Sequence, residues 1–209
     1  MVTAIRNVSN VVTITGSPAV ESRSARLATY AANHLGRQSR ILVEQLSLRR
    51  LPAQDLLSGQ ATHPEIAHYV ELVQRADAIV LATPVYKAAY SGLLKLFLDL
   101  LPQDGFRNKV VLPIATGGSP GHMLAIDYAL KPVLSALGAQ HVLAGIYAVD
   151  QQINWSADNG LVLDARVETR LIAGLNQLTA LLAPEPQTAS VVAARVRYSE
   201  PAELVRCSP

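Results

Sequence analysis

Short runs of aliphatic and β-branched residues alternate along the chain with longer segments whose apolar residues recur at helical spacing. The short runs are typical of buried strands and cover residues 11–15, 40–46, 78–81, 110–115 and 141–149. The longer segments have the periodicity of amphipathic helices and cover residues 25–36, 63–75, 92–101, 121–137 and 164–182. The pattern therefore predicts five strands that alternate with five helices.

This alternation indicates a parallel sheet with helices on both faces, because each strand is apolar on both sides. We expect an α/β, flavodoxin-like, doubly wound fold with a five-stranded parallel sheet in the order 2-1-3-4-5. In this order a ligand binds at the switch point between strands one and three, outside their carboxyl ends. The loops that follow the strands are therefore the expected place of any chemistry.

The loop after the first strand begins at Gly16 and leads into a helix. It offers the hydroxyl groups of Ser17, Ser22 and Ser24 and the guanidinium of Arg23. Backbone N–H groups and the positive end of the helix dipole meet at a helix start, so this loop suits a phosphomonoester. The alternative is an ordinary N-cap with a neighbouring arginine. The loop has neither a Walker A lysine nor a Gly-x-Gly-x-x-Gly motif, which favours a mononucleotide over ATP or NAD.

A second loop, residues 82–92, follows the third strand and combines a lysine, two tyrosines, a proline and several small residues. An aromatic ring, a cation and small residues together suit a flat, anionic ligand such as a flavin. The same composition also occurs in well-packed turns that bind nothing.

A third loop follows the fourth strand and runs from Thr116 through Gly117 and Gly118 to His122. Glycines let the backbone approach a ligand closely, so their N–H groups could face the carbonyl oxygens of a flavin. Glycines before a helix are otherwise common in ordinary turns.

The helix predicted at 121–137 contains Pro132 well inside its apolar pattern. A proline at such a position removes one N–H donor and crowds the preceding turn. We expect either a π-bulge near Tyr128 or a plain proline kink.

Composition narrows the function further. Half of the 209 residues are hydrophobic and the net charge is only +2, so the chain can bury a large core and is not expected to bind nucleic acid. A mean hydropathy of +0.23 suggests that another subunit covers part of the surface. No apolar run is long enough to span a membrane, and the first ten residues lack the hydrophobic region of a secretory signal.

The single cysteine, Cys207, has no intrachain partner for a disulfide, which favours a reducing, cytoplasmic location. We expect one domain over residues 1–183. Residues 184–209 contain four prolines with scattered arginines and glutamates, and are predicted to form a tail that is mobile or draped over a partner.

Three stretches carry a resemblance to a known family. These are the 82–92 loop, the Ser22-Arg23-Ser24 loop and the 110–137 segment with its Ala-Thr-Gly-Gly and Asp-Tyr-Ala-Leu-Lys-Pro motifs. Together they resemble the NADPH-dependent FMN reductases of bacterial alkanesulfonate-utilisation systems, over residues 10–182. The departures are the extension before Val11 and the tail after Pro184.

The resemblance implies FMN as cofactor or substrate, reduction by NADPH or NADH, and delivery of reduced FMN to a separate flavin-dependent monooxygenase. It also implies a homo-oligomer, a dimer or a tetramer, with Tyr128 in a π-helix at a subunit interface. The FMN phosphate would contact Ser17, Ser22, Arg23 and Ser24, and the isoalloxazine ring would lie against Pro84, Val85, Tyr86, Lys87, Thr116, Gly117 and Gly118.

In such reductases hydride passes from the nicotinamide to the flavin, so no catalytic side chain and no metal ion are expected. Two other functions are compatible with the same loops. One is a flavoprotein quinone or azo reductase that retains FMN. The other is a flavodoxin-type electron carrier, which the mildly basic charge disfavours.

Overall fold

The computed structural model describes residues 8–156 and 160–183. Its central sheet runs in the order β2 (Ile41–Ser47), β1 (Ser9–Thr15), β3 (Ala78–Tyr86) and β5 (Val110–Gly117), and its fifth position is shared by β6 (His141–Val142) and β7 (Ile146–Val149). All of these neighbours pair in parallel. The predicted doubly wound order is confirmed.

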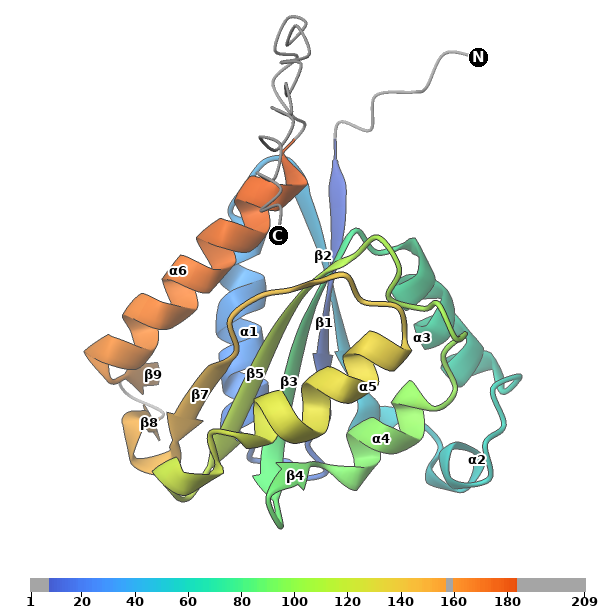
Figure 1. Ribbon diagram of the computed structural model, residues 1–209, viewed down its shortest axis with the longest axis horizontal. Coiled ribbons are helices and arrows are strands. Elements are labelled where there is room, and N and C mark those ends of the chain that lie inside the picture. The colour runs from blue at the N-terminus through green and yellow to red at the C-terminus, as the bar shows by residue number, and fades with distance from the viewer. Residues whose placement is uncertain (1–7, 157–159, 184–209) are drawn as a thin grey trace, which may run out of the picture.

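Helices cover both faces of the sheet. Helices α1 (Arg23–Gly36) and α6 (Ala165–Leu182) lie on one face, while α3 (Pro64–Arg75), α4 (Gly92–Leu98) and α5 (Lys131–Ala136) lie on the other (Figure 1). A short helix, α2 (Ala53–Leu57), follows β2. No helix in the described part of the chain is long and apolar enough to cross a membrane.

The core consists of two apolar layers, one on each side of the sheet. Strand β3 contributes to both, because its successive side chains point to opposite faces. Ile79 and Leu81 pack with the α3, α4 and α5 side, whereas Val80 and Ala82 pack with α1 and α6. All four side chains are fully buried, which explains why this strand is a continuous apolar run.

Local sequence signals set the helix starts. The side chains of Ser22, His63, Ser91 and Asp164 accept hydrogen bonds from the first turns of α1, α3, α4 and α6. Helix α1 begins two residues before the predicted start because Ser22, rather than Ser24, is its N-cap. It extends through Gly36, whose backbone is helical and not left-handed.

The 82–92 segment was predicted as a loop, and this is wrong for most of its length. Strand β3 continues to Tyr86, and β4 (Ala89–Tyr90) folds back on it as an antiparallel hairpin. The pairs Val85 with Tyr90 and Tyr86 with Ala89 leave only Lys87 and Ala88 as the turn. Valine and tyrosine favour extended backbone, which accounts for the longer strand.

Three further differences lie in the second half of the chain. The strand predicted at 141–149 is interrupted between β6 and β7, and the helix predicted at 121–137 is divided into a π-helical segment, Ile126–Leu130, and the short α5. A second, two-stranded sheet pairs β8 (Ile153–Ser156) with β9 (Gly160–Leu163), and the sequence pattern did not predict it. The predicted tail, residues 184–209 with Cys207, lies outside the described residues.

Candidate functional site

The three loops singled out in the sequence meet along one rim of the sheet, at the lower edge of Figure 1. Thr15 at the end of β1 pairs with Ala82 in β3, and Pro84 farther along β3 pairs with Thr116 in β5. The segments that follow these strands therefore begin side by side at their carboxyl ends, as doubly wound sheets require of a ligand site.

Hydrogen bonds of its own serine side chains stabilise the first loop. The Ser22 side chain accepts a hydrogen bond from the backbone N–H of Ala25 at 3.2 Å, and its oxygen lies 3.0 Å from the Ser24 hydroxyl. The Ser17 side chain accepts from the backbone N–H of Ala19 at 3.2 Å. All three serines are buried. The predicted N-cap and the predicted cluster of hydroxyls are therefore both present at the start of α1.

Two residues that the sequence did not single out join the first loop to the second. The Ser91 hydroxyl donates to the backbone carbonyl of Gly16, and its oxygen accepts from the backbone N–H of Leu94. The Thr83 hydroxyl oxygen accepts from the backbone N–H of Ser91 at 3.0 Å. Both side chains are almost fully buried, so these bonds hold the base of the rim in one arrangement.

Arg23 reaches across the rim toward the segment after β7. Its guanidinium lies 3.5 Å from the Asp150 carboxylate, and the two side chains are 51% and 41% exposed. A pair this open to solvent contributes little, about 0–1 kcal/mol. Arg23 is therefore held loosely and can exchange its partner for a ligand. No local signal in the sequence pairs residues this far apart.

The turn between β3 and β4 has an unusual backbone. Lys87 and Ala88 have φ angles of 50° and 62°, which is the left-handed region, although neither is glycine. A left-handed residue with a Cβ costs roughly 1–2 kcal/mol, and strain of this kind concentrates at functional sites. Pro84 is half-buried and Val85 is buried, whereas Tyr86 and Lys87 are exposed at the tip of the hairpin.

The end of β5 packs closely against Tyr147 of the neighbouring strand β7. Thr116 and Gly117 are buried, and a Cβ on Gly117 would lie 2.5 Å from the Tyr147 hydroxyl oxygen. That hydroxyl donates to the backbone carbonyl of Ser119 at 2.6 Å. Burial and the nearby Asp150 carboxylate raise the pKa of Tyr147. Gly117 is thus required by packing, while Gly118 is exposed and its surroundings are open.

The π-helical segment confirms the predicted irregularity before Pro132. Tyr128 lies within it and its side chain is 79% exposed. Met123 and Leu124, just before this segment, are also largely exposed. The three side chains form an apolar face, which we call the π-helix face, close in sequence to the third loop.

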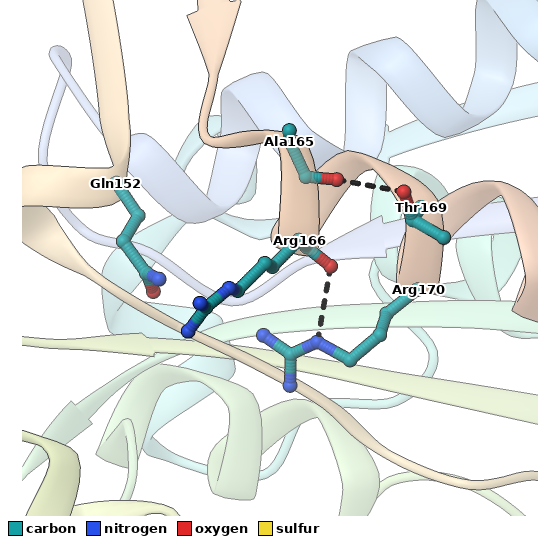
Figure 2. A pocket seen from close by; sticks show the side chains of 5 residues that line it. All are labelled: Gln152, Ala165, Arg166, Thr169 and Arg170. Atoms are coloured by element: carbon teal, nitrogen blue, oxygen red, sulfur yellow. Dashed lines mark hydrogen bonds between the residues drawn. The ribbon is translucent and has the colours of Figure 1, made fainter.

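A separate hollow of 620 Å³ lies at the start of α6 (Figure 2). It is lined by Gln152, Ala165, Arg166, Thr169 and Arg170. The Arg170 guanidinium donates to the backbone carbonyls of Arg166 and Tyr147. None of the predicted ligand-binding residues lines this hollow, so it is distinct from the rim.

The donor set of the rim fits a phosphorylated flat ligand. Hydroxyl groups and a loosely held guanidinium surround the start of α1, where the first backbone N–H groups have no acceptor within the helix. Along the same edge, the strained hairpin lies one strand away from β1 and the open backbone at Gly118 lies two strands away. The fold and this rim define a flavodoxin-like protein with a mononucleotide site.

Comparison with known proteins gives the particular family. The model of the NADPH-dependent FMN reductase family matches residues 9–154, and the chain belongs to this family. An FMN reductase (NADPH) from Pseudomonas putida is 45% identical over 178 residues, covering 85% of this chain and 90% of the relative. An FMN reductase (NADPH) from Escherichia coli is 49% identical over 143 residues, covering 68% of this chain and 74% of the relative.

Solved structures agree with this assignment. An NADH:FMN oxidoreductase (EMOB), in its apo form, superposes with a TM-score of 0.78 at 37% sequence identity, covering 86% of this chain and 92% of that one. A more distant relative, an NADPH azoreductase from a Bacillus species, is 32% identical over 140 residues, covering 66% of this chain and 70% of the relative. The family expected from the sequence is therefore confirmed, and the protein is an oxidoreductase that uses FMN and a reduced nicotinamide.

Proposed function

We propose that this protein reduces FMN with NAD(P)H and supplies the reduced FMN to a separate flavin-dependent monooxygenase, in the acquisition of sulfur from sulfonates. The family and the named relatives support the reductase activity. The monooxygenase and the sulfonate role rest on the resemblance of the rim motifs to reductases of alkanesulfonate utilisation.

The observation that carries the proposal is the meeting of three loops on one rim. In the proposed arrangement, the FMN phosphate binds at the start of α1, against Ser17, Ser22, Arg23 and Ser24. The isoalloxazine ring lies between the hairpin, Pro84 to Lys87, and the end of β5, Thr116 to Gly118. When bound, FMN supplies the hydride acceptor. The chain itself holds the phosphate, orients the ring and donates backbone hydrogen bonds to its polar edge.

The π-helix face has a role in the same proposal. A second copy of the chain covers Met123, Leu124 and Tyr128, because a monomer rarely leaves such an apolar face exposed. Tyr128→Ala should then lower the oligomer mass in light scattering and slow flavin transfer. If mass and transfer rate both match those of the unmodified protein, this part of the proposal is wrong.

The alternative function is a flavoprotein NAD(P)H quinone or azo reductase that retains FMN. A relative named NADPH azoreductase favours it. The two functions differ in what happens to the flavin. A supplier must release reduced FMN, whereas a quinone or azo reductase keeps the flavin and passes the electrons on.

The deciding experiment is steady-state oxidation of NADPH by protein stripped of flavin, with FMN titrated and a quinone offered as a second acceptor. A saturable dependence on added FMN, with reduced FMN appearing in solution, is the expected result. FMN that copurifies with the protein, and turnover that requires the quinone, would establish the alternative.

A further inference from the structure

A polar pocket of 370 Å³ lies beside the first loop, between α1 and the end of β2. Hydroxyl, amide and guanidinium groups line it, on residues Thr15, Ser17, Gln45, Ser47, Arg49 and Arg50. Of these six residues, only Ser17 belongs to the proposed FMN site.

The register of the sheet explains why these groups converge. Thr15, the last residue of β1, pairs in parallel with Ser47, the last residue of β2. Ser17 and Arg49 each follow a paired position by two residues, so the two chain segments leave the sheet side by side. The turn that carries the arginines, Leu48–Arg50, is anchored by the fully buried Leu48. The arginines themselves remain exposed to solvent.

The charge of the pocket is strongly one-sided. Two guanidinium groups line it, and no aspartate or glutamate is among the described residues that do so. Within the described chain, Arg49 and Arg50 take part in no ion pair. Two free arginines beside several hydroxyls form the donor set that binds phosphate best, because a guanidinium can donate two parallel hydrogen bonds to phosphate oxygens.

This pocket adjoins the proposed site of the FMN phosphate and shares Ser17 with it, but it extends toward β2, where no other residue of that site lies. Ser22, Arg23 and Ser24, which we assign to the FMN phosphate, do not line it. Its wall on the helix side is formed by the first two turns of α1, through Ala25 and Thr29. The rim therefore offers a second place for a phosphate, about one strand spacing, or roughly 5 Å, farther toward the sheet edge.

We propose that this pocket binds a ribose phosphomonoester, and that its occupant is the 2′-phosphate of NADPH. The inference rests on the proposed reductase function. A nicotinamide stacked on a flavin above β3 and β5 lies about 12 Å from the end of β2 by strand spacing, and an extended dinucleotide reaches that far. NADH has no phosphate at this position, so Arg49 and Arg50 select NADPH over NADH.

The test replaces both arginines with glutamine, which is shorter but keeps a polar side chain and removes the charge. Arg37→Gln is the matched control, since Arg37 is exposed at the opposite end of α1. In the Arg49→Gln/Arg50→Gln variant, the ratio of kcat/KM for NADPH to that for NADH should fall at least about ten-fold, and the control should keep the ratio. Calorimetric binding of 2′,5′-ADP should weaken by a similar factor relative to ADP.

The other source of a phosphomonoester is FMN itself, so a third comparison measures affinity for FMN against riboflavin. If the double variant loses its preference for FMN over riboflavin and keeps its NADPH ratio, the pocket holds the flavin phosphate and the assignment to NADPH is overturned. An NADPH ratio equal to that of the control, with turnover intact, also overturns it and leaves the proposed function standing. Absence of FMN-dependent turnover in the unmodified protein would instead count against the proposed function.

Discussion

The first loop of the rim and the β3–β4 hairpin differ in how their conformations are held. The first loop, Gly16 to Ser24, is tied down by hydrogen bonds from its own hydroxyls and from Ser91, which involve backbone groups of Gly16, Ala19 and Ala25. The β3–β4 hairpin is a minimal two-residue turn held in a left-handed conformation by the pairing on either side of it. Side-chain hydrogen bonds hold the first loop in place, whereas the hairpin stores strain next to the expected ring of the flavin.

This difference suggests that the first loop and the hairpin contribute differently to ligand binding. A preorganised loop binds a phosphate without further ordering, so it contributes mainly affinity. A strained, exposed hairpin contributes little to affinity, and it can shift when a second ring arrives. Substitutions in the first loop should therefore change FMN binding, and substitutions in the hairpin should change stability with little effect on the phosphate.

Arg23→Ala should have the largest effect on binding. Loss of a charge-assisted contact to phosphate should weaken FMN binding by about 1.5–3 kcal/mol. Asp150→Asn should do the reverse and tighten binding, because it releases Arg23 from its only ion pair within the described chain. Fluorescence titration of FMN measures both. Unchanged affinity in Arg23→Ala would remove this arginine from the phosphate site.

Gly16→Ala tests whether the first loop depends on close packing. A Cβ at this position would lie 2.6 Å from the Cβ of Leu94, so the base of the rim must shift. The expected cost is about 1–3 kcal/mol in the free energy of unfolding. Gly36→Ala is the control, since a Cβ there meets nothing within 4 Å and alanine favours the helix by about 0.5–1 kcal/mol. In urea unfolding, Gly16→Ala should lower the free energy of unfolding and Gly36→Ala should raise it. Equal losses in the two variants would contradict the packing argument.

Tyr147→Phe tests the support of the third loop. At neutral pH it should lower the free energy of unfolding by about 1 kcal/mol, because the hydrogen bond to the Ser119 carbonyl is lost. The pKa of Tyr147 is raised in the folded protein, so above pH ~10 the unfolded state loses this proton first. The stability that Tyr147 contributes is therefore complete below that pH and is lost as the pH rises through the folded pKa.

Urea unfolding at neutral pH and above pH ~10 measures this difference. The other tyrosines are common to both proteins, so their titration cancels in the comparison. A gap between the unmodified protein and Tyr147→Phe that does not narrow at alkaline pH would show that the phenol is not the group responsible.

Ser22 is the N-cap of α1 and is also a proposed contact to the FMN phosphate, and two substitutions distinguish these roles. Ser22→Ala removes the N-cap of α1 and should cost about 1 kcal/mol of stability. Ser22→Asp keeps a capping oxygen but places a negative charge at the expected phosphate, so it should retain stability and lose FMN affinity. If Ser22→Asp binds FMN as the unmodified protein does, the phosphate lies elsewhere, and the Arg49 pocket becomes the first place to look.

The first loop could be predicted well from sequence because its determinants are local. Ser22 caps the helix that follows it, and a cap is recognisable from a few residues. The parallel sheet followed from apolar runs that only a sheet covered on both faces can bury, and its strand order followed from the match of five alternating strands and helices to the flavodoxin-like pattern. The proline at 132 predicted an irregularity near Tyr128, either a π-bulge or a kink, and the structure has a π-helical segment there.

What could not be predicted depends on partners distant in the chain or on an atypical turn. Lys87-Ala88 has none of the Asn-Gly or Asp-Gly signals of a two-residue hairpin, so nothing local indicated that β3 continues. Asp150 and Tyr147 matter only because the sheet carries them next to Arg23 and Gly117. The pocket at Arg49 likewise arises from the register between β1 and β2.

Ala88→Gly is the smallest change and the most direct test of the hairpin. Relief of the left-handed strain should raise the free energy of unfolding by about 1–2 kcal/mol. The greater freedom of glycine in the unfolded chain should lower it by about 0.5–1 kcal/mol. A net gain in unfolding free energy of roughly 0.5–1 kcal/mol is expected, with FMN affinity unaltered. Ala89→Gly, one residue later in β4, is the control and should lose stability, since no left-handed strain is relieved there. Two losses of equal size would mean that the turn stores no strain, and the contrast between the two loops would then rest on hydrogen bonding alone.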